Sequence, residues 1–70
     1  MISYRPLWDT MKAKGVSTYQ LIYKHGFSRG TLDSLKQGRN ITLRTLNDLC
    51  TILDCRVEDI IEYIPDSSRQ

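Results

Sequence analysis

Three segments of the chain share one pattern of apolar and polar residues. In each, an apolar residue precedes a Ser or Thr, and a second apolar residue follows five positions after the first. The segments are Val16-Ser17 before Leu21, Phe27-Ser28 before Leu32, and Ile41-Thr42 before Leu46. A hydroxyl residue between two such apolar residues is typical of a helix N-cap held by a hydrophobic staple. Gln20, three residues after Ser17, also completes a capping box. The pattern therefore predicts three separate helix starts.

Five short helices account for the spacing of the apolar residues, and the predicted ranges are 6–14, 18–24, 29–37, 43–53 and 57–63. Pro6 suits the first turn of the first helix, and Gly15 ends it. Asp54 falls just past the fourth helix, where a left-handed residue is expected. The inward-facing residues that helical spacing predicts are Leu7, Trp8, Met11, Leu21, Ile22, Leu32, Leu35, Leu43, Leu46, Leu49, Cys50, Leu53, Val57, Ile60, Ile61 and Ile64. The predicted fold class is all-α, a compact bundle of five helices.

The last of these helices has a competing interpretation. Arg56 stands where a capping Ser or Asp is expected, and the β-branched content of "VEDIIEYI" suits a short strand. The spacing of its apolar residues favours a helix, which Pro65 would end. We accordingly divide the chain into a domain over residues 1–64 and a polar tail over residues 65–70.

Composition indicates one small globular domain with an uneven charge distribution. The chain has 70 residues, 40% of them hydrophobic and 26% charged, which are ordinary values for a folded protein. Residues 1–53 carry eight Lys and Arg against three Asp, a net charge of +5. Residues 54–70 carry two Arg against five acidic residues, a net charge of −3. This asymmetry indicates either a basic working surface or ordinary solvated charge.

Several other classes of function find little support in the residues. Cys50 and Cys55 form neither a CxxC pair nor a disulfide framework, and His25 is distant from both in sequence, so no metal or cofactor is expected. Ser17, His25 and Asp33 resemble a catalytic trio in type only, since nothing buries them together, and no enzyme is expected. No apolar run approaches the roughly 18 residues of a membrane span, and the first residues lack a signal-peptide core. We therefore expect a cytoplasmic protein with no membrane partner.

The helices predicted at 18–24 and 29–37 are joined by a tight turn that contains Gly26. Two short helices around such a turn are the signature of a helix-turn-helix. At about 100° per residue, the second helix turns its apolar residues to one side and a polar set to the other. That polar set is Arg29, Gly30, Asp33, Ser34 and Gln37. A short helix supported from behind, with a polar outer face, suits entry into the major groove of DNA.

The segment "VSTYQLIYKHGFSRGTLDSLKQGRNITLRTLNDLCTILDCRVEDII" resembles the Cro and phage-repressor family of helix-turn-helix regulators, also called XRE. The resemblance covers the chain from Leu7 to about Ile64. The residues and segments that carry it are Ser17-Thr18, Leu21, Gly26, Ser28, Leu32, Leu35, Gly38, "LRTLNDLCTILDC" and "VEDII". It implies a five-helix lambda-repressor-like domain that acts as a sequence-specific DNA-binding transcriptional regulator, and as a repressor in particular.

The same resemblance implies which residues contact DNA. Base contacts are expected from Arg29, Gly30 and Ser34, with Ser28, Asp33 and Gln37 at the edges. Phosphate contacts are expected from Thr18, Arg39 and Asn40, with Lys24 and Lys36 flanking them. The chemistry agrees, because Arg29 can bind the O6 and N7 atoms of guanine together. Thr18 offers a hydroxyl and a backbone N–H at a helix start, which suits a phosphate.

The expected partner is double-stranded DNA with a palindromic operator, bound by a homodimer with half-sites about 34 Å apart. The family often pairs through its last helices. The apolar residues there exceed what a small core needs, so the dimer interface is expected among Ile60, Ile61, Tyr63 and Ile64. No small-molecule ligand is expected, because no effector domain follows residue 64 in this sequence.

Three residues depart from the family's pattern. Ile22 stands where the family prefers a small residue, because the two helices approach closely there. Gly30 offers no side chain where a base reader is common, which either brings the backbone closer to the groove or blunts the recognition face. Asp33 faces the expected DNA, where it accepts from a cytosine or repels phosphates. The alternative function is therefore a protein-interaction module of the same fold, antitoxin-like or anti-repressor, with weak or no DNA binding.

Overall fold

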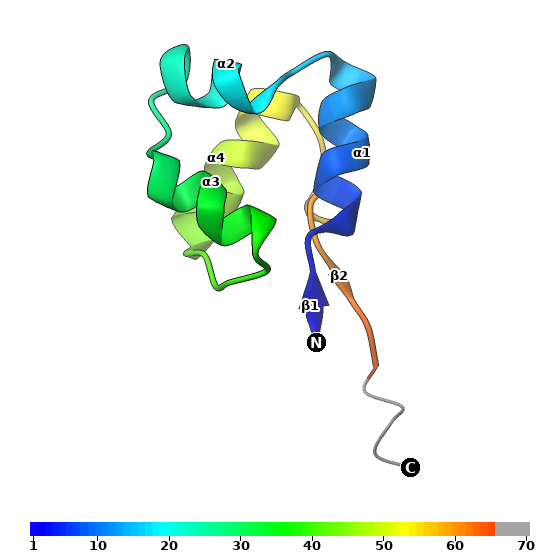
Figure 1. Cartoon of the computed structure of the whole chain (residues 1–70). Coiled ribbons are helices and arrows are strands. Elements are labelled where there is room, and N and C mark those ends of the chain that lie inside the picture. Colours follow the sequence, from blue (N-terminus) through cyan, green and yellow to red (C-terminus); the bar gives the residue numbers. More distant parts are fainter. Residues whose placement is uncertain (66–70) are drawn as a thin grey trace.

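The computed structural model describes residues 1–65 of the chain (Figure 1). Its α-helices there are α1 (Arg5–Lys14), α2 (Thr18–Tyr23), α3 (Arg29–Lys36) and α4 (Leu43–Leu53). A 3₁₀ turn, η1 (Val57–Asp59), and the strands β1 (Ile2–Ser3) and β2 (Glu62–Tyr63) complete the order. Figure 1 shows α2 and α3 on one side of the molecule and α1 with the two-stranded ribbon on the other. Apart from Pro65, the predicted polar tail lies outside the described residues.

The three predicted helix starts are confirmed. The side-chain oxygens of Ser17, Ser28 and Thr42 each accept a hydrogen bond from a backbone N–H three residues later, at 3.2, 3.0 and 3.1 Å. The Gln20 side chain accepts from the Ser17 N–H in return at 2.9 Å, which completes the capping box. Asp54 ends α4 in the left-handed conformation at φ 50°, as predicted. Because these caps depend on neighbouring residues alone, they are visible in the sequence.

The hydrophobic core takes one face from each helix. None of the helices is long enough to be stable alone in water, so burial of these faces is what stabilises them. The buried residues are Tyr4, Leu7, Met11, Leu21, Leu32, Leu35, Leu46, Leu49, Leu53 and Ile60. The Tyr4 hydroxyl also donates to the backbone carbonyl of Arg39 and so fastens the start of α1 to the loop after α3. The helix-turn-helix therefore rests on a support built by the remaining elements.

The prediction of a fifth helix over residues 57–63 is wrong. Only Val57–Asp59 is helical, as a 3₁₀ turn, and Glu62–Tyr63 is a strand that pairs antiparallel with Ile2–Ser3. Arg56 supplies no side-chain cap. A short helix without a cap does not recover its nucleation cost. Pairing with β1 satisfies the backbone groups instead, which the strand interpretation of this segment anticipated in part.

Several predicted inward-facing residues lie elsewhere. Leu43, the first residue of α4, is 82% exposed. Val57 is exposed as well. Ile60, which we expected at a dimer interface, is fully buried and belongs to the core.

None of the helices within residues 1–65 has the length and apolar character needed to cross a membrane.

Candidate nucleic-acid interface

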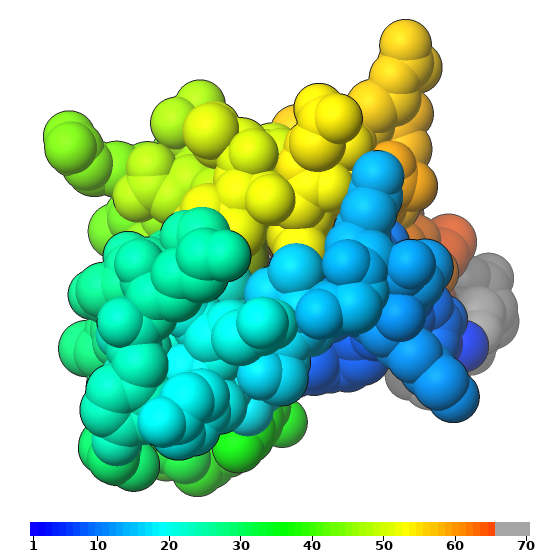
Figure 2. All heavy atoms as spheres, turned by 90° about the horizontal axis from the view of Figure 1, so that it is seen from above, coloured from blue at the N-terminus to red at the C-terminus, as the bar shows by residue number. Residues whose placement is uncertain are grey.

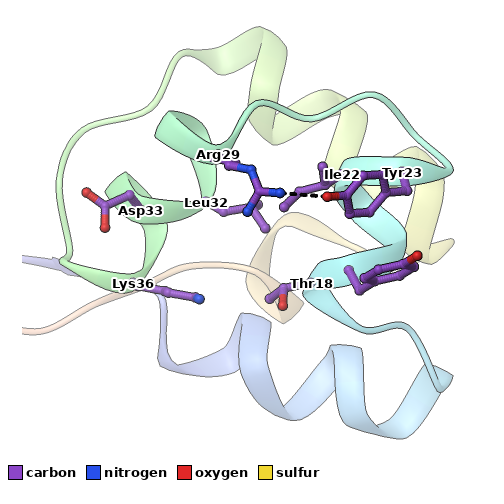
Figure 3. Close-up of a pocket in the computed structure, with 8 residues that line it drawn as sticks. Thr18, Ile22, Tyr23, Arg29, Leu32, Asp33 and Lys36 are labelled. Carbon is purple, nitrogen blue, oxygen red and sulfur yellow. Dashed lines mark hydrogen bonds between the residues drawn. The ribbon is translucent and has the colours of Figure 1, made fainter.

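A hollow of about 390 Å³ opens between α2 and α3, and we call it the α2–α3 hollow. Leu32 and Ile22 supply apolar lining, and Thr18, Arg29 and Lys36 supply polar groups. Figure 3 shows Thr18 and Lys36 at one end of the hollow, with Arg29 extending toward the other. Ile22, the departure from the family's pattern, is half-buried and packs against the core. Tyr19, Tyr23 and Asp33 complete the lining, so the hollow combines apolar and aromatic side chains with cationic, hydroxyl and carboxylate groups.

Arg29 is held by an aromatic side chain from α2. Its Nη2 atom donates to the Tyr23 hydroxyl at 2.6 Å, and its Cζ atom lies 5.9 Å from the centroid of the Tyr23 ring. The Tyr19 ring lies 4.5 Å from the Tyr23 ring, tilted by 39°. Both rings are largely exposed. The chain thus places two aromatic rings and a guanidinium in series beside the α2–α3 hollow.

Tyr19 and Tyr23 are not among the residues that the sequence predicted at the site, although both line the α2–α3 hollow. The expected burial of Leu21 could have predicted that both tyrosines face outward. Residues two positions before and after it, Tyr19 and Tyr23, lie about 200° around the helix and hence on the outward face. Viewed from above, the side chains of α2 and the following turn form an unbroken surface between α1 and the start of α3 (Figure 2).

Asp33, Gln37 and Arg39 form a polar cluster at the end of α3. The Gln37 Nε2 atom donates to both carboxylate oxygens of Asp33 at 3.0 Å, and Arg39 Nη1 lies 3.7 Å from one of them. Asp33 also lines the α2–α3 hollow, and Figure 3 shows its carboxylate pointing away from Arg29. The side chains of Asp33 and Arg39 are more than half exposed, so this ion pair contributes no more than about 1 kcal/mol. The cluster partly neutralises the charge of Asp33, and its weak ion pair with Arg39 is easily broken.

A second hollow, of about 310 Å³, lies between α3 and the start of α4. Two residues expected to contact DNA, Ser34 and Asn40, line it together. The rest of its lining is Thr31, Ile41, Thr42 and Thr45. The structure therefore places some of the expected contacts in two hollows next to α3 and the others outside both.

The other expected DNA contacts are on the surface around α3. Gly30 is exposed, and a Cβ atom added there would meet only the Ser28 Oγ at 3.8 Å, so the fold does not require glycine. The Ser28 hydroxyl caps α3 and also bonds the Thr31 hydroxyl at 2.9 Å. Lys24, at the end of α2, is exposed. Within residues 1–65, neither Lys24 nor Arg29 forms an ion pair with a carboxylate.

The acidic residues of the last segment lie on other elements. Glu62 on β2 pairs with Arg5 at 3.9 Å, and Glu58 on η1 pairs with Arg56 at 3.8 Å. Nearby, burial raises the pKa of the Cys55 thiol, and the neighbouring Cys50 raises it further, so this thiol is protonated at neutral pH. The basic helix-turn-helix and the acidic end therefore occupy different parts of the fold.

Comparison with known proteins gives a family match in sequence and a similar solved structure. The sequence model of the Cro/C1-type HTH DNA-binding domain matches residues 6–66. Among solved structures, the crystal structure of the transcriptional regulator VanUg, form II, is similar with a TM-score of 0.82. Its sequence is 31% identical, and the match covers 93% of this chain and 87% of that one. No curated protein matches this sequence. Both similarities span the helix-turn-helix and the elements packed behind it.

Proposed function

This chain belongs to the Cro/C1-type family of helix-turn-helix DNA-binding domains, and from that premise we propose that it is a sequence-specific transcriptional regulator that places α3 in the major groove. The observation that carries the proposal is the α2–α3 hollow. Arg29 and Lys36 flank it, and neither pairs with a carboxylate within the described part of the chain. Unpaired cations beside an exposed helix attract a polyanion.

In this proposal the residues of α3 read bases and the surrounding residues hold the backbone of the DNA. Arg29 binds a guanine edge, which is worth about 1 to 3 kcal/mol of discrimination. Ser34 lies four positions after Gly30, so the two lie on the same side of α3. The phosphate contacts come from Thr18, Lys24, Lys36, Arg39 and Asn40. Phosphate contacts set orientation and base contacts set sequence.

Asp33 is compatible with this function because of its cluster. Its carboxylate already accepts two hydrogen bonds from Gln37 and lies near Arg39. The repulsion that Asp33 exerts on phosphates is thereby reduced. When Arg39 binds a phosphate, its weak, exposed ion pair with Asp33 is broken. The charge-assisted hydrogen bond to the phosphate compensates for the interaction energy that is lost.

We further propose that the protein acts as a homodimer on a palindromic operator, and as a repressor by occupying that site. The support is an exposed apolar pair across the ribbon. Ile2 and Tyr63 are register partners, 50% and 69% exposed, and Ile61 and Ile64 lie half-buried beside them in sequence. Exposed apolar side chains grouped in this way suit a symmetric interface.

Selection of bound sequences from a random DNA pool, followed by a salt titration, tests the proposal. Each phosphate neutralised contributes about −0.9 to the slope of log K against log[salt]. Lys24, Lys36 and Arg39 together therefore predict a slope of roughly −3 for each subunit. The enriched sequence is expected to contain two inverted half-sites one helical turn apart. A slope near zero with no enriched sequence would contradict DNA reading and favour a protein-interaction module. A single half-site would contradict the dimer alone.

Gly30→Ala is expected to separate stability from DNA binding. The added Cβ has room in the free chain, so the better helix propensity of Ala raises the free energy of unfolding by about 1 kcal/mol. Binding to the selected operator is expected to weaken, because the new methyl group lies where the backbone approaches the groove. Urea unfolding and fluorescence anisotropy with labelled DNA measure the two effects. Unchanged affinity would mean that the glycine blunts the recognition face instead.

A further inference from the structure

We propose that Tyr23, supported by Tyr19, is a positioning residue that holds Arg29 in the conformation used to read DNA. The inference rests on the proposed function and adds to it a determinant of specificity on α2. Arg29 opens α3 and Tyr23 closes α2, so their contact bridges the turn of the helix-turn-helix. The dashed line in Figure 3 marks this bond between the Arg29 guanidinium and the Tyr23 hydroxyl.

The contact with Tyr23 restricts the rotamers of the Arg29 side chain. An arginine side chain has many rotamers, and ordering it on binding lowers affinity. Tyr23 restrains Arg29 in two ways, through the 2.6 Å hydrogen bond and through its ring at 5.9 Å from Cζ. Within residues 1–65, no carboxylate pairs with Arg29, and Asp33 on the same helix is engaged by Gln37 and Arg39. Tyr23 is therefore the group that sets the direction of Arg29.

The bond to Tyr23 leaves Arg29 able to read a base. The hydroxyl oxygen accepts from one Nη atom only, so the other guanidinium N–H groups remain free to bind guanine O6 and N7. The guanidinium lies at the hydroxyl end of the Tyr23 side chain, and both residues line the α2–α3 hollow (Figure 3). Positioning and reading therefore use different groups of the same side chain.

Tyr19 explains how Tyr23 itself is held. The two rings are one helical turn apart on α2, with centroids 4.5 Å from each other. Both are largely exposed, at 68% and 59%, so the core does not account for them. A tilted aromatic pair restricts the rotamers of both rings. Tyr19 therefore restricts the conformation of Tyr23, and Tyr23 in turn restricts the conformation of Arg29.

A double-mutant cycle on the selected operator tests the inference. Tyr23→Phe removes the hydroxyl and keeps the ring, and Tyr23→Leu removes both. We expect affinity losses of about threefold and about tenfold respectively, because an immobilised side chain is typically worth that much in binding. Discrimination against a changed base at the Arg29 position should fall as well. In the Arg29→Ala background, the Tyr23 substitutions should have no further effect. Thr51→Val, which removes an exposed hydroxyl on α4 and keeps the branched shape of the side chain, is the matched control and should leave affinity unchanged.

The outcomes separate the inference from the proposed function. A Tyr23→Phe loss that persists in the Arg29→Ala background would assign Tyr23 a direct DNA contact and overturn positioning. Wild-type binding with no loss in Tyr23→Phe or Tyr23→Leu would overturn the inference alone. A wild-type chain that binds no DNA overturns both. NMR relaxation of the Arg29 Nε in the free protein gives an independent readout, since Tyr23→Leu should lower its order parameter. An unchanged order parameter contradicts the restraint.

Discussion

Replacing Leu35 with Ala is expected to lower the free energy of unfolding by about 2 to 5 kcal/mol. Leu35 lies on the inner face of α3 and is 1% exposed, so the substitution leaves a cavity directly behind the helix that we propose reads DNA. Small domains have about 5 to 15 kcal/mol of stability, and this chain is short even among them. Urea unfolding followed by circular dichroism measures the change. We expect a large shift of the midpoint, with weaker DNA binding at 37 °C as a consequence.

Leu43→Ala is the matched control for this experiment. It makes the same chemical change in a helix, but at a position that is 82% exposed. Its effect should stay within about 0.5 kcal/mol. Equal losses in the two variants would contradict the packing described for α3, because the burial difference would then have no energetic consequence.

Arg29→Ala is expected to weaken binding to the selected operator by about 5- to 150-fold, which corresponds to the loss of a bidentate base contact. The preference at the contacted base pair should relax at the same time. Stability should change little, because Arg29 is exposed. Fluorescence anisotropy at one fixed salt concentration, with the operator and a variant of one base pair, measures both affinity and preference.

Arg56→Ala removes the same charge at a different place. Arg56 precedes η1 and pairs with Glu58, so it lies outside the helix-turn-helix. We expect a change of less than about twofold. Equal effects of the two substitutions would show that net charge, and not base reading, governs the affinity. A uniform loss across all DNA sequences in Arg29→Ala would make Arg29 a phosphate contact.

The parts of the fold that the sequence predicted are those with local causes. Ser17, Ser28 and Thr42 cap their helices through bonds to residues three positions away, and such a signal lies within a few letters of sequence. The turn at Gly26 is equally local, with its positive φ of 76°. These features placed α2 and α3, and with them the face expected to meet DNA.

The parts that were missed depend on partners far away in the chain. Glu62–Tyr63 is a strand because Ile2–Ser3 lies beside it, and the residues near Glu62 in sequence do not indicate that pairing. Helical spacing of the neighbouring isoleucines was therefore misleading. The bond between Arg29 and Tyr23 was missed for another reason. It depends on side-chain directions across a turn, which residue spacing alone does not determine.

The two-stranded ribbon has a consequence for the order in which the parts of the fold form. Ile2 pairs with Tyr63, so almost the whole described chain lies between the two strands. Closing so long a loop costs entropy and makes this pairing a late event compared with helix capping. Ile60, just before β2, is also a fully buried core residue. Helices α2 and α3 can therefore form before the support behind them is complete. The helix-turn-helix is encoded in the middle of the chain, but the elements that support it are complete only once the first and last strands of the ribbon have paired.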